Sequence, residues 1–131
     1  MILIDTSVWI DYYAGTGSPQ TDWLDVSVGR LDIGLTDLNL AEFLQGLRHE
    51  DRTADYLRSL QEFEIFDTGG QELAILSAAN YRKLRRKGIT IRSTIDCLTA
   101  TYCMLHQYGL LHDDRDFDPF ERHLGLQVVH P

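Results

Sequence analysis

The chain has 131 residues, of which 44% are hydrophobic and 24% are charged, as in an ordinary globular protein. This length is enough to bury a core, so we expect residues 1–131 to form a single domain. No apolar run approaches the roughly 20 residues of a membrane helix. The first residues also lack the basic and apolar regions of a signal peptide. We therefore expect a cytoplasmic protein with no membrane contact.

The formal net charge of −8 argues against loose, nonspecific binding to nucleic acid. The basic residues are unevenly distributed, because the stretch 73–95 contains no Asp or Glu. That stretch holds Arg82, Lys83, Arg85, Arg86, Lys87 and Arg92. These cations have two interpretations, a solvated helix end stabilised by the helix dipole or a contact with a phosphate backbone.

Strands and helices alternate in the predicted order. In the first half, the patterns predict a strand over 2–4, a helix through 8–13, a helix from Pro19 to about Val28, a strand over 31–35, and helices over 38–47 and 49–63. In the second half they predict a strand over 64–66, a long helix to Lys87, a helix from about 94 to Gly109, a strand over 110–112, a short helix over 119–124 and a last strand over 126–129.

Two details of the second half are specific enough to test. Thr68-Gly69-Gly70-Gln71 resembles a capping box that opens the long helix, which should stop at Gly88. The helix from 94 is apolar nearly all round and should therefore lie in the centre of the protein. Cys97 and Cys103 lie on that helix, separated by ~9 Å of rise, so we expect buried free thiols, as in a reducing cytoplasm.

Strands that are apolar throughout, alternating with helices, indicate an α/β fold with a mainly parallel sheet that is covered on both faces. In such folds, functional groups gather at the carboxyl ends of the strands. Asp5 follows the first predicted strand, and Asp113 and Asp114 follow the strand over 110–112. Glu42 and Asp96 lie on helices next to strands, so short connections would bring these acids to one edge.

Each acid also has a purely structural interpretation. Asp5 could cap the next helix through the amides of Ser7 or Val8, and Asp96 fits the third position of a capping box begun by Ser93. Glu42 lies on the helix face opposite the leucines, which favours a solvated side chain. Asp113, Asp114, Asp116 and Asp118 could be turn residues before a helix.

The acids are costly to keep beside a core unless something compensates their charge. Several carboxylates from distant parts of the chain therefore suggest one shared cation site. Carboxylates without Cys or His partners favour hard cations, Mg²⁺ or its substitute Mn²⁺. Such ions bridge to phosphates and can activate a water, so an acidic site near a basic stretch points to phosphodiester hydrolysis.

Four segments of the chain, in order, resemble the signature segments of PIN-domain ribonucleases, specifically the VapC-type toxins. They are Ile4–Trp9, Asn39–Gly46, Arg92–Ala100 and His112–Phe117. The resemblance spans essentially the whole chain. It implies a three-layer α/β/α fold, Mg²⁺-dependent endoribonuclease activity, inhibition by a VapB-type antitoxin and homodimerisation.

The resemblance also implies roles for individual residues. Asp5 and Asp96 match the principal metal ligands and Glu42 matches the third acid, in place of the solvated side chain that its periodicity favours. Asp114 best matches the fourth acid, and Asp116 also faces the site. Two supporting pairs also follow from the resemblance. Thr6 or Ser7 would orient the first carboxylate or a metal water, and Arg92 and Ser93 would steer phosphate or support the helix start. The basic stretch itself, not the resemblance, suggests that Arg85, Arg86 and Lys87 hold the RNA backbone.

The expected partners are an RNA, with transfer RNA as the family's commonest target, and operator DNA only indirectly through the antitoxin. The acidic surface is compatible with a basic inhibitory segment. A PIN-like module that binds RNA without cleaving it is the alternative, although such modules usually lose acids that this chain keeps. A haloacid dehalogenase phosphatase needs a second Asp where Ser7 stands, and a receiver domain needs a downstream Lys that is not convincingly placed.

Two further features have competing interpretations. His112 stands where many relatives have Thr; a packed histidine at a strand end is favoured over a catalytic base. Trp9, Trp23, Tyr12 and Tyr13 could stack on RNA bases, but packing in the core or in a dimer is favoured.

Overall fold

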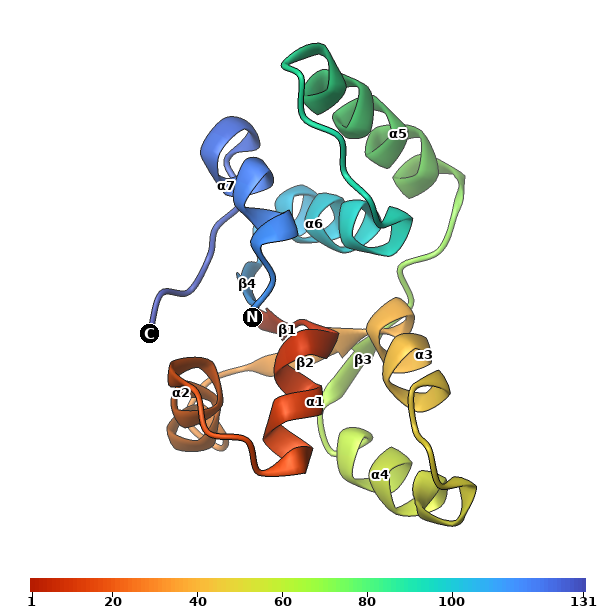
Figure 1. Ribbon diagram of the computed structural model, residues 1–131, viewed down its shortest axis with the longest axis vertical. Coiled ribbons are helices and arrows are strands. Elements are labelled where there is room, and N and C mark those ends of the chain that lie inside the picture. The colour runs from red at the N-terminus through yellow and green to blue at the C-terminus, as the bar shows by residue number, and fades with distance from the viewer.

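The computed structural model describes residues 1–131 and has a four-stranded, all-parallel sheet with the strand order β3-β2-β1-β4 (Figure 1). The strands are β1 (Ile2–Ile4), β2 (Ile33–Thr36), β3 (Glu64–Phe66) and β4 (Gly109–Leu111). The helices are α1 (Thr6–Ala14), α2 (Pro19–Ser27), α3 (Asp37–Gln45), α4 (Thr53–Leu60), α5 (Gln71–Arg86), α6 (Thr94–His106) and α7 (Asp118–Leu124), with 3₁₀ turns η1 (Glu50–Arg52) and η2 (Arg115–Phe117). The predicted α/β/α fold is confirmed. None of the helices combines the length and the apolar character that crossing a bilayer requires.

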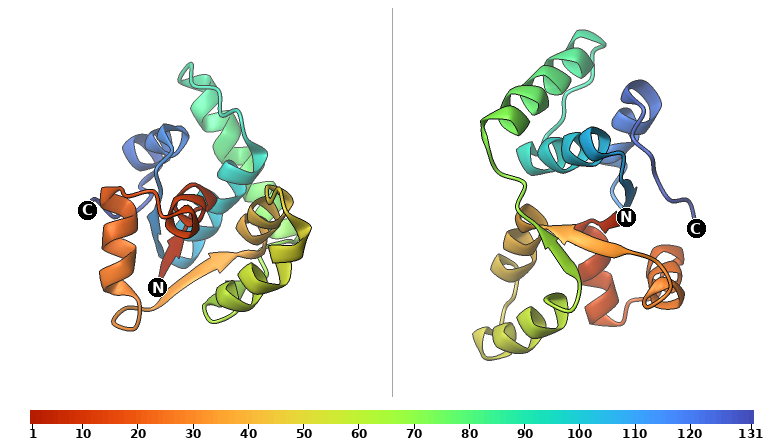
Figure 2. Two further views of the ribbon diagram at one scale, coloured as in Figure 1. Left: turned by 60° about the horizontal axis from the view of Figure 1, so that its bottom comes forward. Right: turned by 180° about the vertical axis from the view of Figure 1, so that it is seen from behind.

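The sheet separates two hydrophobic cores, because successive side chains of a strand point to opposite faces. Leu3 and Leu110 enter one core with residues from α5, α6 and α7. Their neighbours Ile4 and Leu111 enter the other core with residues from α1 to α4. The right-hand view of Figure 2 shows the two groups of helices on opposite sides of the sheet. Both faces are therefore covered, which explains why the strands are apolar rather than alternating.

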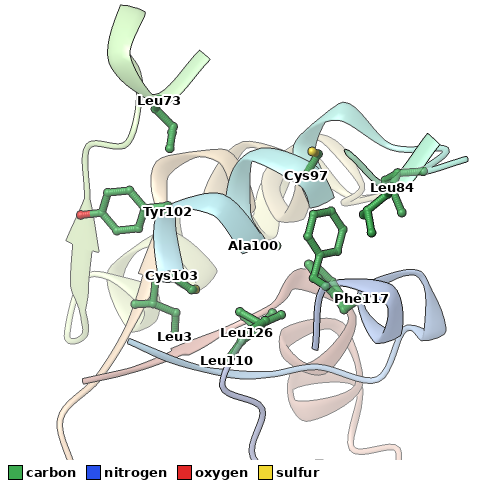
Figure 3. Close-up of a cluster of buried hydrophobic side chains, with 12 residues drawn as sticks. Leu3, Leu73, Leu84, Cys97, Ala100, Tyr102, Cys103, Leu110, Phe117 and Leu126 are labelled. Atoms are coloured by element: carbon green, nitrogen blue, oxygen red, sulfur yellow. The ribbon is translucent and has the colours of Figure 1, made fainter. Parts of the chain in front are cut away.

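Helix α6 lies in the centre of the first core, as predicted. Figure 3 shows its residues Cys97, Ala100 and Cys103 among Leu3, Leu84, Leu110 and Phe117 from the surrounding elements. Both cysteines are buried free thiols, as the sequence predicted. The helix is capped by Ser93, whose hydroxyl accepts a hydrogen bond from the Asp96 amide at 3.2 Å. The first turn of α6 is thus fixed against the core.

The close pairing of β2 with β3 requires glycine at position 34. A Cβ atom at that position would lie 2.7 Å from the Glu64 carbonyl oxygen and 2.9 Å from Cε2 of Phe66. Any side chain would therefore push β3 away from β2. Because β2 leads directly into α3, this pairing also positions the helix that carries Glu42.

The predicted capping box at Thr68 is wrong. Helix α5 begins after Gly70, which makes no side-chain cap. Asp37 instead accepts hydrogen bonds from the Thr68 hydroxyl at 2.5 Å and from its amide at 3.2 Å. Thr68 lies two residues before the Gly70 cap position, so its side chain is not placed to cap α5 and is held instead by the Asp37 carboxylate. The end of α5 was predicted correctly, with Gly88 in the left-handed region just beyond it.

Two predicted boundaries near the end of the chain are also wrong. Helix α6 ends at His106, the following Gln107 adopts a left-handed conformation, and Gly109 already belongs to β4. A Cβ atom at position 109 would lie 2.6 Å from Cδ1 of Ile2 on the neighbouring strand, so a larger residue there would require the end of that side chain to move. The predicted strand over 126–129 reduces to a single bridge between Val128 and Leu110, so it covers the edge of β4 without forming a regular strand.

Two predictions in the first half differ in extent. The strand over 31–35 is shorter at its start, because Leu31 and Asp32 are exposed and pairing begins at Ile33. The helix over 49–63 divides into η1 and α4. The remaining elements agree with the prediction to within a few residues.

Candidate metal centre

Five acidic side chains meet at the carboxyl end of the sheet, and four different parts of the chain supply them. Asp5 follows β1, Glu42 lies on α3 and Asp96 lies in the first turn of α6. Asp114 and Asp116 follow β4 at η2. Their oxygens form two groups, Asp5–Glu42–Asp96 and Asp96–Asp114–Asp116, and within each group the ligand atoms lie within 4.8 Å of one another. Asp96 belongs to both groups and is therefore the centre of the cluster.

Asp5 uses its two oxygens differently. Its Oδ2 accepts hydrogen bonds from the amide of Ser7 at 3.0 Å and from its hydroxyl at 2.6 Å, which caps α1. Its Oδ1 faces α3 and lies 3.3 Å from Nδ2 of Asn39. The helix-capping interpretation of Asp5 is thus correct, and it does not exclude a place in the acidic cluster.

Glu42 is half-buried and faces the cluster rather than solvent. Its Oε1 accepts a hydrogen bond from the Thr6 hydroxyl at 2.8 Å and lies 3.3 Å from Nδ2 of Asn39. The periodicity argument for a solvated Glu42 is therefore wrong. It considered only the apolar face of α3, whereas α3 also packs its polar side against the start of α1.

Asp96 is 7% exposed, and its carboxylate accepts no hydrogen bond from the protein. Ser93 caps the helix through the Asp96 amide, but the Asp96 side chain does not return the bond to Ser93 as a capping box would. Both oxygens of this carboxylate thus lack a protein partner, although they are not sealed from solvent. A buried charge in this position is costly unless a cation binds it.

Asp114 and Asp116 form the outer side of the cluster. Asp114 caps η2, since its Oδ1 accepts a hydrogen bond from the Asp116 amide at 2.9 Å. Asp116 forms an ion pair with Arg92 at 3.2 Å. Asp113 is exposed and belongs to neither group, although its amide donates to the Ser7 hydroxyl at 3.1 Å. The structure therefore brings Asp114 and Asp116 to the cluster and leaves the Asp113 side chain outside.

The electrostatics indicate a site that lacks positive charge. Burial, together with the charge of Glu42, raises the pKa of Asp5 to about 6. Burial and then the charges of the other acids, beginning with Asp5, raise the pKa of Asp96 to about 7. Arg92 is the one basic side chain in an ion pair with the cluster, and it lies at the exposed rim. Oxygen ligands without a compensating cation fit a hard divalent ion.

The predicted supporting residues divide their roles. Ser7 orients Asp5, and Thr6 orients Glu42. Sequence reasoning did not single out Asn39, although it is fully buried and contacts both of these carboxylates. The available signal was its spacing, because Asn39 stands three residues before Glu42 and so shares its helix face.

His112 is a packed histidine, as favoured from the sequence. Its Nδ1 accepts a hydrogen bond from the Asp114 amide at 3.1 Å, and its ring centroid lies 4.9 Å from that of Phe117. Burial lowers its pKa. A neutral ring whose acceptor nitrogen is occupied is a poor general base. Trp9 is likewise fully buried and packs against Tyr12, Tyr13 and Phe63.

The basic residues lie apart from the acids. Arg85, Arg86 and Lys87 are exposed at the C-terminal end of α5, which Figure 1 shows reaching away from the sheet. Arg85 stacks over the Tyr81 ring at 5.6 Å. The segment that follows α5 returns to α6 and ends at Arg92 and Ser93, beside the acidic cluster. The structure therefore connects the two charged regions through Arg92 without merging them.

Comparison with known proteins gives a consistent picture. Ribonuclease VapC11 of Mycobacterium tuberculosis and VapC ribonuclease Mb1587 of Mycobacterium bovis are each 34% identical to this chain over 141 aligned positions, covering 98% of both proteins. VapBC2 from Rickettsia felis, solved bound to a promoter DNA fragment, superposes with a TM-score of 0.79 at 19% identity over 98% of both chains. DNA-bound VapBC from Salmonella typhimurium gives 0.75 at 18% identity over 98% of this chain and 96% of that one. The PIN-domain family model matches residues 2–122, and the chain belongs to the PIN-domain family.

Proposed function

We propose that this protein is a VapC-type toxin, an Mg²⁺-dependent endoribonuclease that hydrolyses RNA phosphodiester bonds. The proposal rests on two clusters of three acidic side chains that share Asp96. No basic side chain forms an ion pair with Asp96 itself, because Arg92 pairs with Asp116. The names of the relatives, VapC ribonucleases of similar length, support RNA as the substrate. A structured RNA such as transfer RNA is the expected target.

Asp5, Glu42 and Asp96 would hold the ion, and Asp96, Asp114 and Asp116 would hold a second one if two bind. The all-oxygen donor set favours Mg²⁺, with Mn²⁺ as a substitute. When bound, the ion supplies Lewis acidity, which neutralises phosphate charge and makes water a better nucleophile for in-line attack. The family resemblance implies products with 5′-phosphate and 3′-hydroxyl ends.

The remaining groups orient the ligands and the substrate. Ser7 and Thr6 hold the Asp5 and Glu42 carboxylates through hydrogen bonds of 2.6 and 2.8 Å, so that these side chains need not reorganise on binding. Arg92 lies at the rim next to Asp116, where its guanidinium is able to contact a phosphate. The exposed Arg85, Arg86 and Lys87 would bind the RNA backbone farther away.

The proposed partner is a VapB-type antitoxin, as in the solved VapBC complexes, and operator DNA would be reached only through it. Its candidate binding surface is a cleft of about 350 Å³ between α1, α3 and η1. Tyr13, Phe43 and Tyr56 line this cleft together with Ile10, Ala14, Gly46, Leu47, Arg48, His49 and Arg52. Arg52 lies over the Tyr56 ring at 5.2 Å. An apolar lining with basic but no acidic side chains fits an apolar segment that carries acidic residues, and the acidic surface stays compatible with a basic inhibitory segment elsewhere on the partner.

Three further parts of the proposal follow from the resemblance and the composition. Residues 1–131 act as one domain, and two copies form a homodimer. The buried free thiols of Cys97 and Cys103 support a reducing compartment, the cytoplasm.

The test is the substitution Asp96→Asn. It keeps the shape of the side chain but removes the negative charge of the one acid that belongs to both clusters. RNA cleavage should therefore fall by at least about 10²-fold. Circular dichroism should show an unchanged fold. Asp113→Asn is the matched control, because this exposed side chain lies outside both groups and its variant should cleave RNA normally.

Undiminished cleavage by the Asp96→Asn protein would refute the proposed active site. The alternative of a silent RNA-binding module makes the opposite prediction for the wild type, namely RNA binding without Mg²⁺-dependent cleavage. Cleavage assays with and without a chelator distinguish the two.

A further inference from the structure

Asn39 is a fully buried polar side chain at the point where α3 meets α1. Its Nδ2 lies 3.3 Å from Oδ1 of Asp5, 3.1 Å from Oγ1 of Thr6 and 3.3 Å from Oε1 of Glu42. One amide group therefore faces two carboxylates, one at the N-terminal cap of α1 and one on α3. Each of these carboxylates belongs to the acidic cluster.

The orientation of the Asn39 amide is fixed from its other end. The Thr36 hydroxyl accepts a hydrogen bond from the Asn39 backbone amide at 3.0 Å, which leaves its own hydrogen to donate to Oδ1 of Asn39 at 2.9 Å. With Oδ1 occupied by this donor, Nδ2 must point to the acids. The reversed amide would place an oxygen against Asp5 and Glu42, where it would be repelled. The amide orientation thus follows from the surrounding donors and acceptors.

We propose that Asn39 is a positioning residue for the metal ligands, holding Asp5 and Glu42 in one arrangement by donating hydrogen bonds to both. This inference rests on the proposed function, since it assigns Asn39 to the same metal centre. Asn39 itself acts only through the two carboxylates. The second oxygen of Glu42 does not face Asn39, whereas Oδ2 of Asp5 is held by the Ser7 amide and hydroxyl.

The chemistry of the amide suits this role better than that of a charged side chain. A lysine at the same position would neutralise the acids and compete with a divalent ion for them. An aspartate would add a further negative charge and could not donate. A neutral amide supplies donors without changing the net charge of the site, so it orders the ligands and leaves their affinity for a cation intact. Such supporting hydrogen bonds typically contribute about 10–100-fold to metal affinity.

The test measures Mn²⁺ binding to the chain in the absence of RNA, by titration calorimetry. Asn39→Ala should raise the dissociation constant at least about tenfold. Asn80→Ala is the matched control, because Asn80 also donates an interhelical hydrogen bond, to Thr101 at 3.1 Å, but lies away from the acids. It should lower the melting temperature without changing the affinity for Mn²⁺.

Asn39→Ser provides a second variant in case the alanine protein does not fold. Its hydroxyl is able to donate to only one acceptor, so its affinity should fall between those of the wild type and Asn39→Ala. Two results would overturn the positioning role and leave the proposed function standing. One is a folded Asn39 variant with unchanged affinity for Mn²⁺, and the other is an equal loss of affinity in Asn80→Ala. A wild type that binds no Mn²⁺ would overturn both.

Discussion

At the scale of single residues, the acids of the cluster combine a local role with a long-range one. Asp5 caps α1 with one oxygen and faces α3 with the other. Asp114 caps η2 and also meets Asp96. Sequence patterns predicted Asp5 and Asp114, because a short acidic side chain just after a strand is suited both to capping the next helix and to binding a cation. They presented as alternatives two roles that the structure combines in one side chain.

The raised pKa of Asp96, about 7 against an ordinary 3.8, predicts how stability depends on pH without metal. The folded protein binds this proton more tightly than the unfolded chain does. Its contribution to stability is therefore full below about pH 4 and is lost as the pH rises through about 7. In a chelator, the melting temperature should be higher at pH 5 than at pH 8.

Thermal denaturation in EDTA at both pH values checks this expectation. Asp96→Asn serves as the control, since it should reduce the difference between pH 5 and pH 8, and Mn²⁺ should restore stability to the wild type at pH 8. Equal pH dependence in the wild type and Asp96→Asn would contradict the raised pKa.

At the scale of elements, periodicity and capping residues located the seven helices and four strands well, because each is determined mainly by its own apolar pattern and its ends. The errors occur where distant elements intervene. Thr68 binds Asp37 instead of capping α5, and Gly109 belongs to β4 because its backbone pairs with Ile2 of β1. Glu42 faces α1, which no pattern within α3 reveals.

The cleft between α1, α3 and η1 gives a prediction at the same scale. Arg52→Glu reverses a charge in its lining, so the complex with the co-expressed antitoxin should weaken by about tenfold or more. The physical reason is repulsion of the acidic side chains expected on the partner. Surface plasmon resonance measures the affinity, and RNA cleavage by the free variant should be unchanged.

Arg58→Glu provides a matched control for this experiment. Arg58 is exposed on α4 and pairs with Asp55, but it does not line the cleft. Its reversal should leave antitoxin affinity within twofold or so. Equal losses for both variants would indicate a general charge effect and exclude the cleft as the specific surface.

At the scale of the whole molecule, charge is separated along the fold. The acids converge at the sheet, whereas Arg85, Arg86 and Lys87 lie at the far end of α5 (Figure 1). Both interpretations of this basic stretch fit the structure, because it is a solvated helix end and is also free of ion pairs. An experiment with RNA separates them.

Replacing Arg85, Arg86 and Lys87 together by Gln should weaken RNA binding. The slope of log affinity against log salt concentration should become shallower by about two. The reason is that fewer counterions are released when fewer phosphates are contacted. Fluorescence anisotropy at several salt concentrations measures the slope.

The control is a triple variant with Gln at three other exposed arginines, Arg30, Arg58 and Arg122. These residues lie outside the basic end of α5, and their replacement changes the net charge by the same amount. If the slope stays the same after the three substitutions at the end of α5, the basic stretch is a solvated helix end and not an RNA contact.

Patterns along the chain were enough to predict the α/β class, the parallel sheet, the central position of α6 and the acids that follow β1 and β4 or begin α6, because these depend on local apolar patterns and on residues that are costly beside a core. The packing of the elements in three dimensions establishes which carboxylates meet, that the Asp113 side chain stays outside, and that Asn39 links Asp5 to Glu42. The reason is that hydrogen bonds between α1, α3 and the segments after the strands depend on how the helices pack, and no single segment encodes that packing.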